Sequence, residues 1–213
     1  MAHRVTAPAM QRARRLLDQR ITPFVTTGAI NFAVTSTEEW FESPGYEAAV
    51  ASPVTPFAIG SKWGQAWHTR WFHLTAVVPQ HLADVDIAAY VDIGFNGRGD
   101  GFQVEAVAWR NGEIVHAIQP DRRLIHLGTH AGGTEVDIWV EAAATPIIAG
   151  HEYGYGPTTF GDPATAPTTP IYTLRSAHIA NFNSEVNDLA IALHAVIDLA
   201  VDLPDNSPQR ARI

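Results

Sequence analysis

Carboxylates and aromatic rings alternate with apolar residues along three segments in the middle of the chain. Six of these side chains occupy positions opposite the apolar sets: Tyr90, Asp92, Glu105, Trp109, Trp139 and Glu141. Carboxylates accept hydrogen bonds from sugar hydroxyls, and aromatic ring faces pack on the C–H surfaces of sugars. The pattern indicates a carbohydrate-binding or domain-docking face. The alternative is a face covered by the C-terminal helix, a loop or another domain.

The histidines offer a metal-binding alternative. His126 and His130 are four positions apart, a spacing that lets two ligands converge on one side of a strand or helix. No third ligand is marked in the sequence, and Gly128, Gly132 and Gly133 are typical of a loop rather than of a rigid frame. We therefore predict no metal site. A small metal-dependent enzyme of the cupin type remains the alternative, and it would need a further histidine ligand.

Motifs for common enzyme chemistries do not occur in the sequence. There is no Gly-rich phosphate loop ending in Gly-Lys-Ser/Thr, no HExxH and no Gly-x-Ser-x-Gly. The glycine-rich run from Gly94 to Gly101 lies between two predicted strands without a following helix, so it is interpreted as a hairpin connection. We predict no catalytic residue in this chain.

Alternating apolar residues predict the elements that position these side chains. The sets that share one face of a strand are Ile87, Ala89, Val91 and Ile93; Phe102, Val104, Ala106 and Ala108; Ile114, His116 and Ile118; and Val136, Ile138, Val140 and Ala142. Asn111-Gly112 tolerates positive φ and predicts a tight hairpin turn. Strands joined by short turns favour a mainly β protein with an antiparallel, jelly-roll-like β-sandwich.

Helical patterns occur near both ends. A short helix is predicted from about Met10 to Gln19, and a long one from about Ala177 to Val201. The apolar stripe of the long helix is Phe182, Val186, Leu189, Leu193, Val196, Ala200 and Leu203. The expected organisation is a helical segment at 1–30, a β-sandwich at 31–174, a C-terminal helix at 175–203, and a linker at 204–213 that leads to an absent catalytic domain.

Composition narrows the function classes further. The 213 residues carry a formal net charge of −8 and one lysine, Lys62, which argues against nucleic-acid binding. Without cysteines, the chain has neither disulfides nor thiolate metal ligands. No stretch reaches the length of a signal peptide or membrane span, so we expect a cytoplasmic protein without membrane partners.

The segment from Trp63 to Phe72, WGQAWHTRWF, followed by Val78-Pro79, resembles the N-terminal region of α-mannosidases of glycoside hydrolase family 38. The matched signature residues are Trp63, Gly64, Trp67, Thr69, Trp71 and Phe72. Four further segments match in order: GFQVEA at 101–106, NGEIVHAI at 111–118, VDIWVEAA at 136–143, and LPDNSPQRAR at 203–212, which is similar to a linker of bacterial members.

The resemblance implies a parent enzyme that hydrolyses α-mannosides with retention and uses a divalent metal: zinc, cobalt or calcium. Its catalytic and metal-binding residues lie C-terminal to the matched region, so none is assigned here. The expectation is a non-catalytic accessory domain without a cofactor of its own. Its expected partners are the catalytic domain of the same polypeptide, a second copy of the chain and an α-mannoside glycan. The alternative function is an independent carbohydrate-binding module.

Overall fold

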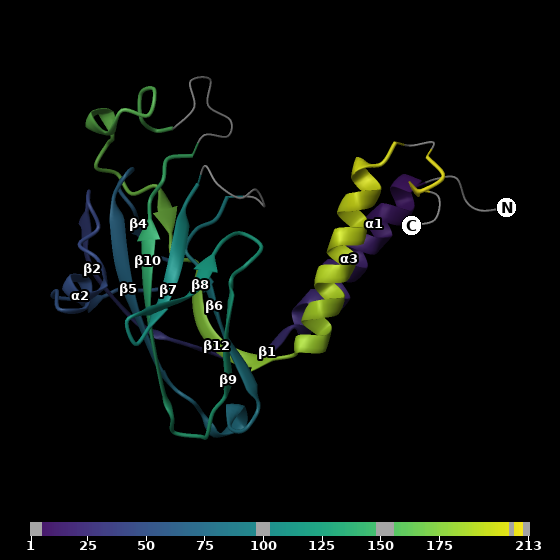
Figure 1. Cartoon of the computed structure of the whole chain (residues 1–213), viewed down its shortest axis with the longest axis horizontal. Helices are drawn as coiled ribbons and strands as arrows, with labels where there is room; N and C mark the ends of the chain where they lie inside the picture. Colours follow the sequence, from purple (N-terminus) through teal and green to yellow (C-terminus); the bar gives the residue numbers. More distant parts are fainter. Residues whose placement is uncertain (1–5, 97–102, 148–155, 205–206, 211–213) are drawn as a thin grey trace. The chain divides into compact units, whose positions relative to one another are not determined.

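The computed structural model describes residues 6–96, 103–147, 156–204 and 207–210 (Figure 1). Contacts within the chain divide it into two units. The helical unit comprises Met1–Gly28 and Asn181–Ile213, and the sandwich unit comprises Ala29–Ala180. Among the described residues, no helix combines the length and apolar character needed to cross a membrane.

Two antiparallel sheets build the sandwich. The four-stranded sheet has the order β1 (Thr26–Asn31), β12 (Ser176–Phe182), β6 (Asp86–Asp92), β9 (Leu124–Thr129). The six-stranded sheet has the order β3 (Thr55–Pro56), β2 (Ala33–Trp40), β5 (Thr69–Val77), β10 (Glu135–Ala143), β7 (Glu105–Arg110), β8 (Glu113–Ile118). A small ribbon pairs β11 (Tyr172–Thr173) with β4 (Lys62–Trp63). The predicted class, a mainly β, jelly-roll-like sandwich with a helix near each end, is confirmed.

The core lies between the two sheets, where the predicted alternation places it. Ile87 and Ala89 of β6 are fully buried in the same apolar cluster as Ile138 and Val140 of β10. Burying one large aliphatic side chain stabilises a fold by roughly 1.5–3 kcal/mol, so this cluster accounts for much of the stability of the sandwich. Phe102, which was predicted to join it, lies outside the described residues.

The predicted hairpin turn at Asn111-Gly112 is present, but the strand after it differs from the prediction. Both turn residues have positive φ, 52° and 83°. A bulge between Ala108 and Trp109 shifts the register of β7 against β8, so Ile114 pairs with Trp109 while His116 pairs with Ala108. Because one extra residue reverses the alternation, Ile114 is 57% exposed instead of sharing the buried side with Ile118.

The long C-terminal helix begins later than its apolar spacing predicts. Residues 176–182 form strand β12, whose Ala177 and Ile179 are buried in the core, and helix α3 spans Ser184–Asp202. Asn183 separates the two elements, since its side chain accepts the Val186 N–H at 3.1 Å as an N-cap. The predicted start near Ala177 is therefore wrong, whereas the predicted end near Val201 lies one residue from the observed end at Asp202.

The first half of the helical unit also differs from its predicted bounds. Helix α1 spans Thr6–Leu16, and a π-helical turn, η1 (Leu17–Ile21), and a 3-10 turn, η2 (Thr22–Phe24), follow it. The remaining short elements are α2 (Tyr46–Val50), η3 (Gln80–Leu82) and η4 (Pro163–Thr165). The helices α1, η1 and α3 contact one another, and the buried apolar residues among the described part of this unit are Leu17, Val25, Ile197 and Ala200.

Candidate docking and carbohydrate-binding face

The structure brings four of the six predicted face residues together. Glu105 and Trp109 lie on β7, and Trp139 and Glu141 lie on its neighbour β10, with Trp139 directly opposite Trp109. Their alternate neighbours point into the core, so these side chains lie on the outer side of the six-stranded sheet. We call this side of the six-stranded sheet, which carries Glu105, Trp109, Trp139 and Glu141, the outer face.

Tyr90 and Asp92 do not join the outer face. They belong to β6 of the four-stranded sheet, whose inward residues pack against those of β10. Side chains on the non-core sides of two facing sheets point in opposite directions. The six predicted residues therefore occupy both outsides of the sandwich.

Asp92 and Tyr90 instead take part in a polar cluster around Arg123. Asp92 Oδ2 lies 2.7 Å from Arg123 Nη1, and its Oδ1 accepts the Gly94 N–H at 2.9 Å. Arg123 also donates to the Tyr90 hydroxyl, and the Tyr90 ring stacks on His178 at 5.1 Å. Burial lowers the pKa of His178 below its ordinary value of 6.5. These contacts tie the end of β6 to β9 and β12.

An aromatic cluster occupies the middle of the outer face. Trp71 is fully buried there, Trp139 is 6% exposed, and Ala49 of α2 packs against both. Trp109 stacks on Tyr46 with ring centroids 5.2 Å apart, and Trp139 stacks on His73 at 4.3 Å. Trp109 and Trp139 therefore each have one ring face covered by another aromatic ring.

Hydrogen bonds fix the polar groups around this cluster. Ser43 donates to Glu141 Oε1 at 2.6 Å and accepts the Trp71 indole N–H at 3.2 Å, so the loop before α2 is tied to two strands. His73 Nε2 lies 2.7 Å from an oxygen of Asp137. The Trp109 indole nitrogen is buried and has no hydrogen-bond partner among the described residues.

A depression of about 260 Å³ lies on the outer face over β7, β8 and β10. Its lining includes the carboxylates of Glu105 and Glu141 and the polar side chains of Thr69 and Gln119. Glu105 is exposed, while Glu141 is half-buried and already bound by Ser43. Carboxylate, hydroxyl and amide groups around a small hollow can accept and donate hydrogen bonds to a sugar or to a peptide segment.

The signature segment from Trp63 to Phe72 supports the end of the sandwich. Trp63 is 1% exposed, donates its indole N–H to the Ile93 carbonyl at 2.8 Å, and packs edge-on against Phe72. Gly64 has φ 85°, and a Cβ there would lie 2.8 Å from the Cβ of Ala144. Only glycine fits this backbone without strain. The signature tryptophans at 63 and 71 are thus packing residues.

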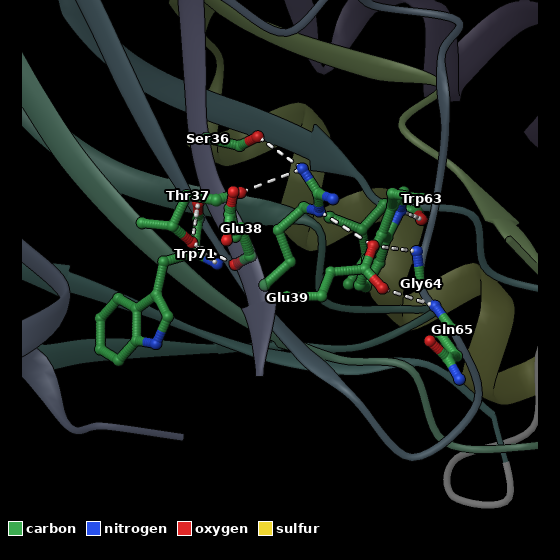
Figure 2. A network of polar contacts seen from close by, with 10 residues as sticks. Ser36, Thr37, Glu38, Glu39, Trp63, Gly64, Gln65 and Trp71 are labelled. Carbon is green, nitrogen blue, oxygen red and sulfur yellow. Dashed lines mark hydrogen bonds and ion pairs between the residues drawn. The ribbon is translucent and has the colours of Figure 1, made fainter. Parts of the chain in front are cut away.

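Glu39 holds this segment in place, and sequence reasoning missed it. Its carboxylate accepts the N–H groups of Gly64 at 2.8 Å and Gln65 at 2.7 Å, as Figure 2 shows. It also lies 3.0 Å from Nε of Arg70, which donates to Ser36 Oγ and to the Thr37 carbonyl. A glutamate on a strand carries no local signal of this role, because its partners are at least 25 residues away in sequence.

The two histidines of the metal alternative lie in different surroundings. His126 Nε2 is 2.7 Å from a carboxylate oxygen of Asp86, and His130 Nε2 lies 3.0 Å from the Leu127 carbonyl oxygen. Within the described parts of the chain, no group of three histidine, aspartate or glutamate side chains could hold a metal ion. The described residues therefore do not support the cupin-type alternative.

Two of the three comparisons with known proteins find alpha-mannosidases. The family described as alpha-mannosidase, jelly roll domain, matches residues 28–180. Alpha-mannosidase 2C1 of Mus musculus is 23% identical over 168 residues, which are 76% of this chain and 14% of that protein, so the chain spans a small part of this curated relative. A beta-glucuronidase of Faecalibacterium prausnitzii gives a TM-score of 0.38 at 10% identity, over 71% of this chain and 30% of that one.

Proposed function

The chain belongs to the family of alpha-mannosidase jelly roll domains, and we propose that it is the non-catalytic accessory domain of an enzyme that hydrolyses α-mannosides. In this proposal the domain docks the catalytic domain of the same polypeptide. The parent enzyme belongs to glycoside hydrolase family 38, is of the bacterial type, works in the cytoplasm, and binds its zinc, cobalt or calcium ion in the catalytic domain.

The state of the carboxylates supports a structural role. A retaining glycosidase needs two carboxyl groups about 5 Å apart, one as nucleophile and one as acid. Glu39 instead binds two backbone N–H groups and Arg70, and Glu141 accepts the Ser43 hydroxyl. These two carboxylates thus stabilise local structure, which supports the accessory role.

One observation carries the docking proposal: apolar side chains are exposed beside the aromatic cluster. Ile114 is 57% exposed on β8, opposite Trp109, and its neighbour Val115 is 47% exposed. Strand β8 is the edge of the six-stranded sheet, so its outer backbone groups are open to pairing. Exposed apolar residues on an open edge are typical of an interface with another domain.

The first test measures hydrolysis. The 213-residue chain alone, supplied with zinc, cobalt or calcium, should not turn over an aryl α-mannoside. Robust turnover that survives repurification would overturn the non-catalytic assignment.

The second test measures docking in the polypeptide as its source organism makes it. Ile114→Glu should loosen the domain and speed its release by limited proteolysis, because a charge cannot be buried there unpaired. Val77→Glu is the matched control, since Val77 is 60% exposed on β5, outside the proposed edge. Equal proteolysis of the two variants would refute docking through β8.

Carbohydrate binding is the second candidate, and the depression beside Glu105 and Glu141 is the observation in its favour. Methyl α-mannoside, titrated into the chain by calorimetry, should bind in the depression. Glu105→Gln should weaken that binding at least about tenfold without unfolding, since Glu105 is exposed. Trp139→Ala is unsuitable as a probe because Trp139 is packed inside the aromatic cluster, and removing a buried tryptophan costs about 3–5 kcal/mol.

A further inference from the structure

Phe160 occupies a backbone position that an aromatic residue rarely adopts. Its φ is 52°, and the φ of Gly161, which follows it, is 80°. The Asp162 N–H donates to the Thr159 carbonyl at 2.9 Å, so residues 159–162 form a β-turn whose two central residues have positive φ. This is the signature of a type I′ turn, in which asparagine, aspartate or glycine usually comes first. A bulky residue at that position is an outlier.

The chain contains a matched turn that has the residue favoured by local folding. At Asn111-Gly112 the two φ angles are 52° and 83°, nearly the same as at Phe160-Gly161. Asparagine tolerates this region because its short polar side chain can form local hydrogen bonds, whereas other residues bring their Cβ too close to the following carbonyl oxygen. The turn therefore does not need Phe160, and local folding alone would favour asparagine in its place.

The side chain of Phe160 gains little burial from this strained backbone. The residue is 73% exposed, the highest fraction among the exposed large apolar residues of the described chain. One exposed apolar residue is ordinary on a protein surface, but an exposed aromatic residue that is also strained is not. Strained residues cluster at sites where the protein binds a ligand or a partner. The combination of strain and exposure therefore indicates a role of Phe160 in binding.

Hydrogen bonds within the loop hold this turn in place. The Thr159 N–H donates to Thr165 Oγ1 at 2.8 Å, and the Thr165 hydroxyl donates to the Asp162 carbonyl at 2.7 Å. Asp162 Oδ1 accepts the Ala164 N–H at 2.9 Å and so caps η4. In Figure 1 this segment is the green loop with a short helix, and it lies beyond the strand ends of the sandwich. A loop that is already ordered loses less conformational entropy when it binds.

The chemistry around Phe160 favours an apolar pocket on a protein over a sugar. Phenylalanine has no polar group, and the one carboxylate of the turn, Asp162, already uses Oδ1 to cap η4. Small-molecule sites combine apolar rings with convergent polar groups, whereas aromatic anchors of protein interfaces fill desolvated pockets. A second copy of the chain fits poorly, because the three depressions described on it have glutamates in their linings: Glu105 and Glu141, Glu47, and Glu135.

We propose that Phe160 anchors this domain to the catalytic domain of the parent enzyme by inserting its ring into an apolar pocket there. The proposal rests on the accessory role proposed above and adds a contact separate from the edge strand β8. The matched region is only 14% of the curated relative, so most of a polypeptide of that length lies outside this chain and can carry the pocket. Transfer of the ring out of water then offsets the strain of the turn.

Reciprocal substitutions in the two turns test the strain. In the 213-residue chain, Phe160→Asn should raise the folding equilibrium constant at least about threefold, and Asn111→Phe should lower it by a similar factor. Asn111 is exposed as well, so both exchanges take place outside the core. Chemical denaturation measures both constants. A Phe160→Asn chain that is no more stable than the unsubstituted chain overturns the argument from strain.

Limited proteolysis of the parent polypeptide tests the contact. Phe160→Asn should speed release of the domain at least about fivefold, although it stabilises the domain itself. Thr159→Asn is the matched control, since Thr159 is exposed in the same turn, and it should leave the rate unchanged.

An unchanged release rate for Phe160→Asn overturns the proposal. If Ile114→Glu still speeds release in that case, docking through β8 stands without Phe160, and if neither variant does, both proposals fail. Titration with methyl α-mannoside provides the remaining comparison. A Phe160→Asn chain that loses sugar binding, while the release rate of the parent polypeptide stays unchanged, would assign the ring to a carbohydrate and refute the anchor.

Discussion

Removing the carboxylate of Glu39 tests whether the signature segment depends on the hydrogen bonds of this one side chain, which is distant from the segment in sequence. Glu39→Ala deletes an acceptor shared by the N–H groups of Gly64 and Gln65 and the guanidinium of Arg70. Hydrogen bonds to charged groups contribute about 1.5–3 kcal/mol each, but the three share one carboxylate and are not additive. The side chains of Glu39 and Arg70 are 15% and 19% exposed, so water compensates part of the loss.

We therefore expect Glu39→Ala to lower the free energy of unfolding by about 3 kcal/mol. This is less than the largest losses that follow removal of one partner of a fully buried ion pair. In a chain of this size that corresponds to a fall in Tm of roughly 6–12 °C. The stability of Glu39→Gln should lie between that of the unsubstituted chain and that of Glu39→Ala. The amide keeps one acceptor oxygen, but it turns an NH₂ group toward a backbone N–H. Chemical denaturation and calorimetry measure both quantities.

The neighbouring Glu38 supplies the matched control, since it is exposed on the same strand. Glu38→Ala should change stability by no more than about 0.5 kcal/mol. A double-mutant cycle with Arg70→Ala should give a coupling energy of about 1–3 kcal/mol between Glu39 and Arg70. If Glu39→Ala and Glu38→Ala lower the free energy of unfolding equally, the packing of Trp63 and Phe72 holds the segment and the hydrogen bonds of Glu39 are not needed.

The other predictions concern backbone strain and protonation. Gly64→Ala should destabilise the chain by about 1–3 kcal/mol more than Gly60→Ala, measured by denaturation, because both glycines have positive φ but only at Gly64 would the new Cβ clash. Stability should also decrease as pH falls below 6.5, because burial lowers the pKa of His178 and the unfolded chain then binds a proton that the folded chain does not. His178→Phe should flatten this decrease, with a residual slope from His116, whose pKa burial also lowers; an unchanged profile would rule out His178 as its source.

The sandwich could be predicted because strand alternation is a local property. One side of each strand faces the same core, so a period of two reveals the buried residues without knowledge of their partners. The turn at Asn111-Gly112 was equally local, since both residues tolerate positive φ. The start of α3 was harder, because Phe182 and Val186 fit helical spacing across Asn183 although the first belongs to a strand.

The assignment of strands to sheets could not be predicted, because it depends on pairings between distant segments. Strand β10 lies between β5 and β7, whereas β6 pairs with β9, and nothing within β6 or β7 specifies this choice. The outward carboxylates Asp92 and Glu141 look equivalent in the sequence. In the structure they lie on opposite outer sides of the sandwich. The face predicted from alternation alone therefore combined residues from two different sheets.

The roles of the acidic residues show a similar limit. Glu141 and Glu105 occupy similar positions on neighbouring strands, yet Ser43 binds Glu141 while Glu105 remains exposed beside the depression. The difference comes from the loop before α2, which is 98 residues from Glu141 in sequence and also accepts the Trp71 indole N–H. A carboxylate on the outer face can therefore accept a hydrogen bond from a sugar hydroxyl only when distant loops leave it free. On the outer face, that condition selects Glu105 over Glu141 as the residue to substitute first.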